Sequence, residues 1–121
     1  MDPTGIAIGF SNIFTGGIVL LLALPLLRGS IKPNHLYGVR FAQAFASDQA
    51  WYEINRYGAR RLIFWSIPVV LLGVVAIFLP LGSSFAATLL FACAPLIVVI
   101  PAIESWRFAR RYPVTNSDES K

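Results

Sequence analysis

The sequence predicts an all-α integral membrane protein, in which residues 1–121 form one bundle of three transmembrane helices with an interfacial amphipathic helix between the first and second. Hydrophobic residues make up 56% of the chain and charged residues only 13%, which is far more apolar than a soluble domain. Three runs, at about 5–27, 62–81 and 85–103, contain no charged side chain. Each is long enough to cross about 30 Å of hydrocarbon as a helix, the form that pairs every backbone amide within its own segment.

We expect the first run to be a retained helix rather than a cleaved signal peptide. An acid, Asp2, precedes it where a signal peptide has Lys or Arg, and Arg28 follows it in place of a small-residue cleavage site. Gly5 and Gly9 form a small-xxx-small pair. Two polar residues inside the run, Asn12 and Thr15, are interpreted as contacts between helices, with contact to a ligand or partner as the alternative.

The second and third runs contain prolines that should kink them. Pro68, Pro95 and Pro101 each lack a backbone N–H, so each frees a carbonyl that a neighbour has to satisfy. The short connection at 80–84 predicts a tight hairpin between these two helices. The single cysteine, Cys93, is interpreted as a small apolar packing residue.

The segment 28–61 lies between the first two runs and is predicted to end in a helix at the membrane surface. Gly29 can end the first helix and Pro33 favours an extended chain. Ser47 is a suitable N-cap, and Asp48 would lie in the first turn, where the helix dipole favours an acid. Spacings of three and four then place one set of residues on a common face: Trp51, Ile54, Asn55, Gly58 and Leu62.

Basic residues predict the orientation of the chain. None precedes the first run or lies in the hairpin turn, and all fall in the segment 28–61 or in the polar tail 104–121. This distribution predicts an external N-terminus, with both basic segments in the cytoplasm. Membrane lipids are then the expected partners, because a basic cytoplasmic rim that faces anionic lipid accounts for the formal net charge of +4 without a nucleic acid.

Few residues could support catalysis, so we expect no enzyme, no cofactor and no metal site. Asp2, Asp118 and Glu119 lie in chain ends expected to be mobile. The one histidine, His35, has no Cys or His neighbour at a metal-binding spacing, and no glycine-rich phosphate motif occurs. No Ser–His spacing indicates a nucleophile with its base.

Glu104 directly follows the third run and allows two interpretations. It could be an interfacial carboxylate that pairs with Arg107, Arg60 or Arg61, or a partner for Arg40 that holds the central segment against the bundle. The basic cluster that follows is interpreted as an interfacial anchor, with a specific site as the alternative; it consists of Trp106, Arg107, Arg110 and Arg111.

An amide, a phenol, a glycine and a guanidinium fall within seven residues as Asn34, Tyr37, Gly38 and Arg40. Gly38 allows a turn that residues with a Cβ rarely adopt, and Arg40 could pair bidentately with a carboxylate or a lipid phosphate. The residues themselves favour a role in locking the structure over ligand binding, and both remain open.

These residues resemble the SdpI family of bacterial membrane proteins, named for an immunity protein that protects producers of a secreted peptide toxin. The family pattern is Asn-x-x-Tyr-Gly-x-Arg, then an acid shortly before Trp-x-x-x-Asn-x-x-Gly. The matching positions here are Asn34, Tyr37, Gly38, Arg40, Asp48, Trp51, Asn55 and Gly58. Two features depart from the family: Phe41 stands where members commonly have a small polar residue, and the named protein is longer.

The resemblance implies a non-enzymatic protein of the bacterial inner membrane in toxin immunity or signalling, with 34–58 as its working surface. Its partners would be membrane lipids and either a peptide toxin or another membrane protein. The alternative is a small accessory or structural subunit of a larger membrane complex, and a homo-oligomer is also open.

Overall fold

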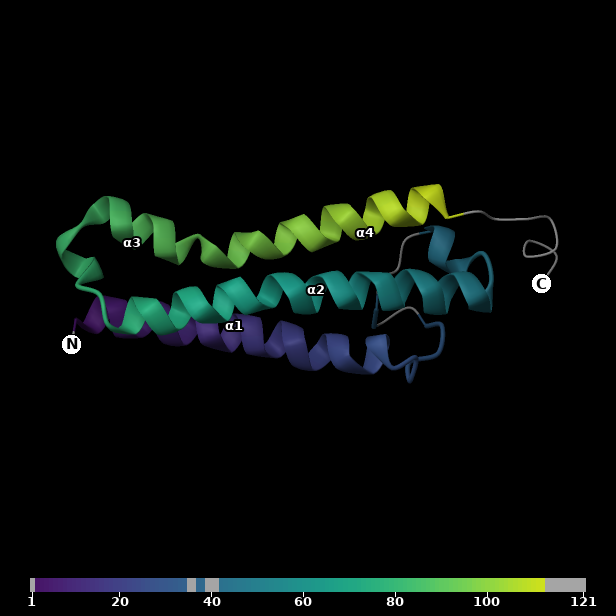
Figure 1. The fold of residues 1–121 in the computed structure, drawn as a ribbon, viewed down its shortest axis with the longest axis horizontal. Coiled ribbons are helices and arrows are strands. Elements are labelled where there is room, and N and C mark those ends of the chain that lie inside the picture. The colour runs from purple at the N-terminus through teal and green to yellow at the C-terminus, as the bar shows by residue number, and fades with distance from the viewer. Residues whose placement is uncertain (1, 35–36, 39–41, 113–121) are drawn as a thin grey trace.

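The computed structural model describes residues 2–34, 37–38 and 42–112, and these form a helical bundle (Figure 1). The α-helices are α1 (Pro3–Leu27), α2 (Asp48–Ile77), α3 (Phe85–Ala92) and α4 (Val99–Arg111). Short 3₁₀ turns lie at Ala42–Phe45, Leu81–Ser83 and Ala94–Val98. Helical stretches long and apolar enough to cross a membrane are Pro3–Leu27, Asp48–Ile77 and Phe85–Arg111. The predicted all-α membrane fold with three spans is therefore confirmed.

α2 lies between α1 on one side and the α3–α4 rod on the other (Figure 1). The helix predicted after Ser47 is the first part of α2, which runs on into the second span because Ala59, Arg60 and Arg61 continue the helix without a break. The predicted cap is present: the Ser47 hydroxyl accepts a hydrogen bond from the Ala50 N–H at 3.0 Å.

Glycines allow the α1 and α2 backbones to approach each other closely. A Cβ added at Gly9 would lie 2.6 Å from the Gly73 carbonyl oxygen, and one added at Gly73 would lie 2.7 Å from the Gly9 oxygen. At Gly5 the same atom would lie 2.5 Å from the Ala76 oxygen, and at Gly16 it would lie 2.6 Å from a Val70 methyl. Because these residues are small, α1 and α2 contact each other through backbone atoms, which is a common basis of helix association in lipid.

The third span is interrupted at Pro95, where a 3₁₀ turn joins α3 to α4. Pro95 has no N–H for the Phe91 carbonyl, its partner in a regular helix. The Asn12 side-chain amide of α1 donates to this carbonyl instead, at 2.9 Å. Asn12 therefore supplies the hydrogen bond that the proline removes. In contrast, α2 continues through Pro68 and α4 through Pro101.

Asp2 has a defined structural role that contradicts the expectation of a mobile acid. Its carboxylate accepts from the Thr4 N–H at 2.7 Å and thereby caps α1, and its other oxygen accepts from the Gly82 N–H at 3.1 Å. The hydrogen bond from Thr4 in particular lowers the pKa of Asp2. The ionised carboxylate thus joins the start of α1 to the hairpin turn. The tail 113–121, with Asp118 and Glu119, lies outside the described residues.

Gly73→Ala should destabilise the fold, because the new methyl group would press on the α1 backbone. Overpacking of this kind costs about 1–3 kcal/mol. Gly17→Ala is the matched control, since a Cβ there meets nothing within 4 Å. We expect a lower unfolding temperature in mild detergent for Gly73→Ala alone; equal effects of the two substitutions would contradict the close contact of α1 and α2.

Asn12→Leu should lower the free energy of unfolding by about 0.6 to 1.7 kcal/mol, the average and the maximum measured for hydrogen bonds between helices in a membrane. A Pro95→Ala background should reduce this loss, because the backbone N–H that it restores can bond to the Phe91 carbonyl. A double-mutant cycle in mixed micelles measures the coupling. Equal losses in both backgrounds would show that Asn12 does not compensate for Pro95.

Candidate functional site

The residues of the predicted motif meet where the chain after α1 returns to the first turns of α2. Trp51 is fully buried, and its indole N–H donates to the Ile31 carbonyl at 2.9 Å. Its side chain belongs to an apolar group, called here the Trp51 cluster, that brings together the connecting segment, α2 and α4: Ala44, Ala50, Trp51, Ile54 and Ala109. Trp51 therefore anchors the segment that precedes α2.

Gly38 occupies a position that requires glycine for two reasons. Its φ of +114° lies in a region that residues with a Cβ rarely adopt. A Cβ would also lie 2.7 Å from the Asn55 Oδ1 and 3.2 Å from the Trp51 ring. Asn55 is buried as well, and its amide donates to the Trp51 carbonyl at 2.9 Å. Thus Gly38, Trp51 and Asn55 are in mutual contact, although Trp51 and Asn55 follow the glycine by 13 and 17 positions in the chain.

Asn34 and Tyr37 shape the turn that leads to Gly38. The Asn34 side chain donates to the Lys32 carbonyl at 2.8 Å and accepts from the Tyr37 N–H at 2.7 Å. The Tyr37 hydroxyl donates to the Leu22 carbonyl of α1. Since Leu22 lies within the first membrane span, this hydrogen bond connects the motif directly to a transmembrane helix.

A groove of about 270 Å³ lies beside this hydrogen bond. Its lining is largely apolar and comes from α1, α2 and the motif: Val19, Leu22, Ala23, Leu26, Tyr37, Gly38 and Leu62. Leu22 is half exposed, so the groove borders the lipid-facing surface of α1. An apolar group that enters it would touch Tyr37 and Gly38.

The remaining motif residues do not all join this contact. Gly58 is buried on α2, one turn after Asn55, whereas Asp48 is exposed at the start of the helix. Arg40 and His35 lie outside the described residues. The structure thus brings together Asn34, Tyr37, Gly38, Trp51 and Asn55.

Glu104 forms a separate bridge between α4 and α2. Its carboxylate accepts from Arg61 at 3.1 Å and 2.8 Å, through Nε and Nη2, and from the Trp65 indole at 2.8 Å. Of the considered partners that lie in the described part of the chain, Arg61 is the one that pairs with Glu104, and Trp65 was not foreseen. The bidentate geometry fixes the rotation of α4 about its own axis relative to α2.

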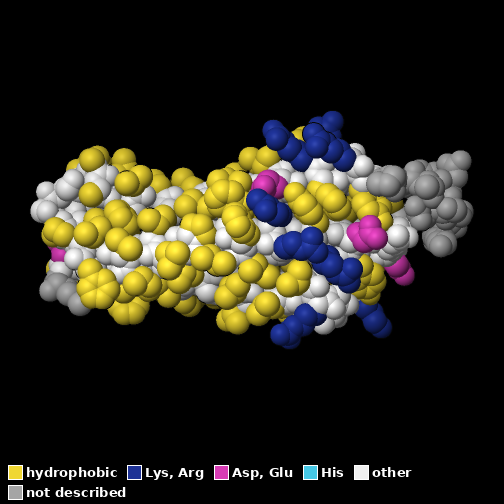
Figure 2. Space-filling model, viewed as in Figure 1, with side chains coloured by type: hydrophobic (Ala, Val, Ile, Leu, Met, Phe, Trp, Pro, Cys, Tyr) yellow, Lys and Arg dark blue, Asp and Glu magenta, His cyan; other side chains and the backbone are white. Residues whose placement is uncertain are grey.

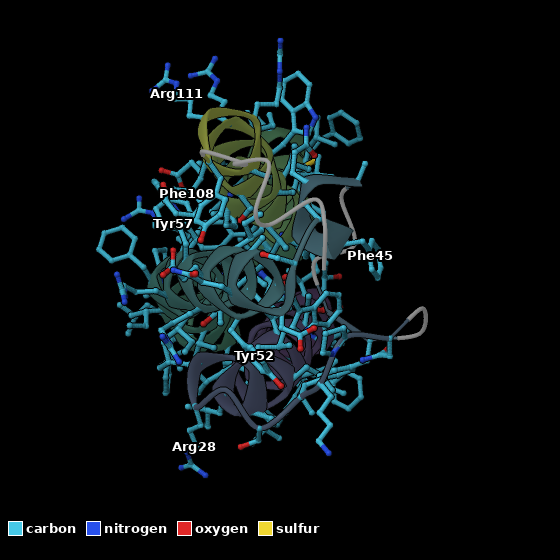
Figure 3. The ribbon with its side chains drawn as sticks, turned by 90° about the vertical axis from the view of Figure 1, so that its right-hand side faces the viewer. Arg28, Phe45, Tyr52, Tyr57, Phe108 and Arg111 are labelled. Atoms are coloured by element: carbon cyan, nitrogen blue, oxygen red, sulfur yellow. The ribbon has the colours of Figure 1, made fainter. Side chains whose placement is uncertain are left out.

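An aromatic stack strengthens the same interface. Tyr57 and Phe108 lie face to face between α2 and α4, with ring centroids 4.1 Å apart and planes 7° apart (Figure 3). Sequence reasoning missed this pair; the available signal was that Phe108 follows Glu104 by one helical turn, as Tyr57 precedes Arg61 by one.

The chemistry of the site is that of packing and hydrogen bonding. Among the described residues, no three His, Cys, Asp or Glu side chains lie close enough together to hold a metal ion. The polar groups of the motif bond mostly to backbone carbonyls, an arrangement that positions a chain segment.

Trp51→Phe should loosen the connecting segment, because phenylalanine keeps an aromatic ring but cannot donate to the Ile31 carbonyl. We expect faster hydrogen exchange across 28–34 and a loss of about 1–3 kcal/mol for the unsatisfied group. Trp106→Phe is the matched control, since Trp106 is exposed on α4. Unchanged exchange in Trp51→Phe would contradict the anchoring role.

Comparison with known proteins agrees with this geometry. The model of the SdpI/YfhL protein family matches residues 30–103, which is more than half of the chain. No curated protein and no solved structure gives a match. The matched region contains the whole motif, α2, α3 and the first part of α4, while α1 and Glu104 lie outside it. The chain therefore belongs to the SdpI/YfhL protein family.

Proposed function

We propose that this family member acts without catalysis in the bacterial inner membrane, in toxin immunity or signalling, and that the segment 34–58 is its working surface. The family match and the membrane fold support the setting. The packing of the motif residues supports the choice of surface, because they contact α1, α2 and α4. A displacement of the motif would therefore alter contacts with all three helices.

We further propose that the motif faces the cytoplasm and the N-terminus lies outside. Lys and Arg side chains gather over one half of the molecule, and the other half of the face shown has many hydrophobic side chains and no Lys or Arg (Figure 2). The basic half holds the end of α1, the start of α2 and the end of α4 (Figure 1). Positively charged segments of membrane proteins remain on the cytoplasmic side.

The observation that carries the proposal is the hydrogen bond from Tyr37 to the Leu22 carbonyl, which forms a wall of the groove. A membrane-embedded apolar segment of a peptide toxin that entered the groove would compete with this contact. Displacement of Tyr37 would also move Gly38, which lies against Trp51 and Asn55. The ligand would thereby favour a second arrangement of the connecting segment, to the extent that it binds that arrangement more tightly.

The alternative, an accessory subunit of a membrane complex, is favoured by a different observation. No residue of α3 is buried, and Phe85 and Leu90 are 83% and 72% exposed. A partner helix could cover this face. Purification of the tagged chain from native membranes in mild detergent tests the alternative, since a subunit should retain a stoichiometric membrane partner, whereas isolation of the chain alone would count against it.

Leu22→Trp should abolish protection by filling the groove. The assay is survival of a sensitive bacterial strain that expresses the chain, challenged with a panel of secreted membrane-active peptide toxins. Leu21→Trp is the matched control, because Leu21 is exposed on α1 and does not line the groove. Tyr37→Phe should weaken protection by removing the hydroxyl while the ring remains.

We expect the unmodified chain to protect against at least one toxin. At equal membrane levels, Leu21→Trp should retain this protection and Leu22→Trp should lose it. If the unmodified chain protects and Leu22→Trp protects equally well, the groove has no role in immunity. If the unmodified chain protects against none of the toxins, immunity loses its support and the accessory role becomes the better account.

A further inference from the structure

The end of α4 carries a basic surface that neither the motif nor the groove uses. Arg107, Arg110 and Arg111 are exposed there and, with Trp106, line a hollow of about 620 Å³. The Arg110 guanidinium lies over the Trp106 ring, 4.6 Å from its centroid. Arg111 points away from the bundle, on the side opposite to Arg28 (Figure 3).

These arginines are available for an external anion. Within the described part of the chain, none of them forms an ion pair, and the carboxylate one turn before Arg107, that of Glu104, is engaged by Arg61. Guanidinium groups bind phosphate oxygens in a bidentate manner. Three positive charges that no described carboxylate pairs with therefore surround a hollow whose chemistry suits a phosphodiester.

An exposed apolar track leads along the same helix to this basic surface. Val99, Ile103, Trp106 and Arg110 follow one another at spacings of four, three and four residues, which places them along one stripe of the helix. Val99 and Ile103 are 51% and 47% exposed, although they lie in a membrane span. A hydrocarbon chain can lie along these side chains while its headgroup reaches the arginines.

We propose that this surface is a binding site for one anionic glycerophospholipid, with its phosphate at Arg107, Arg110 and Arg111 and an acyl chain along Ile103 and Val99. The apolar track selects a lipid over a free phosphate, because a small anion would leave it uncovered. The Trp106 indole suits headgroup depth, where its ring and its N–H meet different surroundings. Clusters of Lys and Arg beside the end of a membrane helix attract acidic lipid headgroups.

Native mass spectrometry of the full chain in mild detergent, titrated with phosphatidylglycerol, tests the proposal. The variant R107Q/R110Q/R111Q should lower the affinity at least about tenfold, since each basic group near a membrane surface contributes about 1 kcal/mol. The control R28Q/K32Q/R60Q removes the same charge from other exposed positions and should bind like the unmodified chain. Arg110→Gln alone should lower the affinity about fivefold, which provides a milder variant.

Two further arms distinguish the lipid from other sources of the same chemistry. Phosphatidylcholine should bind more weakly than phosphatidylglycerol, and soluble glycerophosphoglycerol or inorganic phosphate should displace the lipid poorly. Equal losses in the two triple variants would overturn the proposal in favour of general charge attraction. Equal binding of both lipids, or displacement by the soluble headgroup at the lipid's own concentration, would also overturn it.

Discussion

The close contact between α1 and α2 determines where the other parts of this molecule can lie. Backbone contact at Gly9 and Gly73 sets both the distance between the helices and their relative height. With that height set, Ala23 and Leu26 meet Ala59 in a buried group that Ile31 and Tyr37 cover. The Leu22 carbonyl is thereby placed within reach of the Tyr37 hydroxyl. A contact near one end of α1 thus positions the motif near the other.

The motif connects a polar segment to three helices. Trp51 holds the segment from inside, and Gly38 lets the chain pass close to Trp51 and Asn55. The same indole belongs to the Trp51 cluster, which includes Ala109 of α4. Glu104 and Arg61 join α4 to α2 by a separate ion pair. Because Trp51 takes part in the contacts of both Gly38 and Ala109, a displacement of the segment at the groove can reach α2 and α4. This arrangement is the physical basis of the role that we propose in immunity or signalling.

The spans and the buried face of α2 could be predicted from the sequence, because they depend on local composition and spacing. Uncharged runs of helical length predicted the spans, and intervals of three and four placed Trp51, Ile54 and Asn55 together. The partners could not be predicted, since they depend on the relative heights of helices. Glu104 had several arginines within reach in sequence, and only the packing of α4 on α2 selects Arg61. Likewise, Pro95 signalled a free carbonyl, but nothing local indicated that Asn12 would satisfy it.

The central claim, that the motif is seated against α1, is tested most directly by solid-state nuclear magnetic resonance of the chain in lipid bilayers. Isotope labels at the Tyr37 side chain and the Leu22 carbonyl should give a direct cross-peak between the phenol carbon and the carbonyl carbon. The Tyr37→Phe chain should lose the hydrogen-bond shift of that carbonyl. If the Tyr37 ring instead gives cross-peaks to water or lipid and none to Leu22, the motif is not seated on α1, and the proposed route from groove to cytoplasmic surface fails.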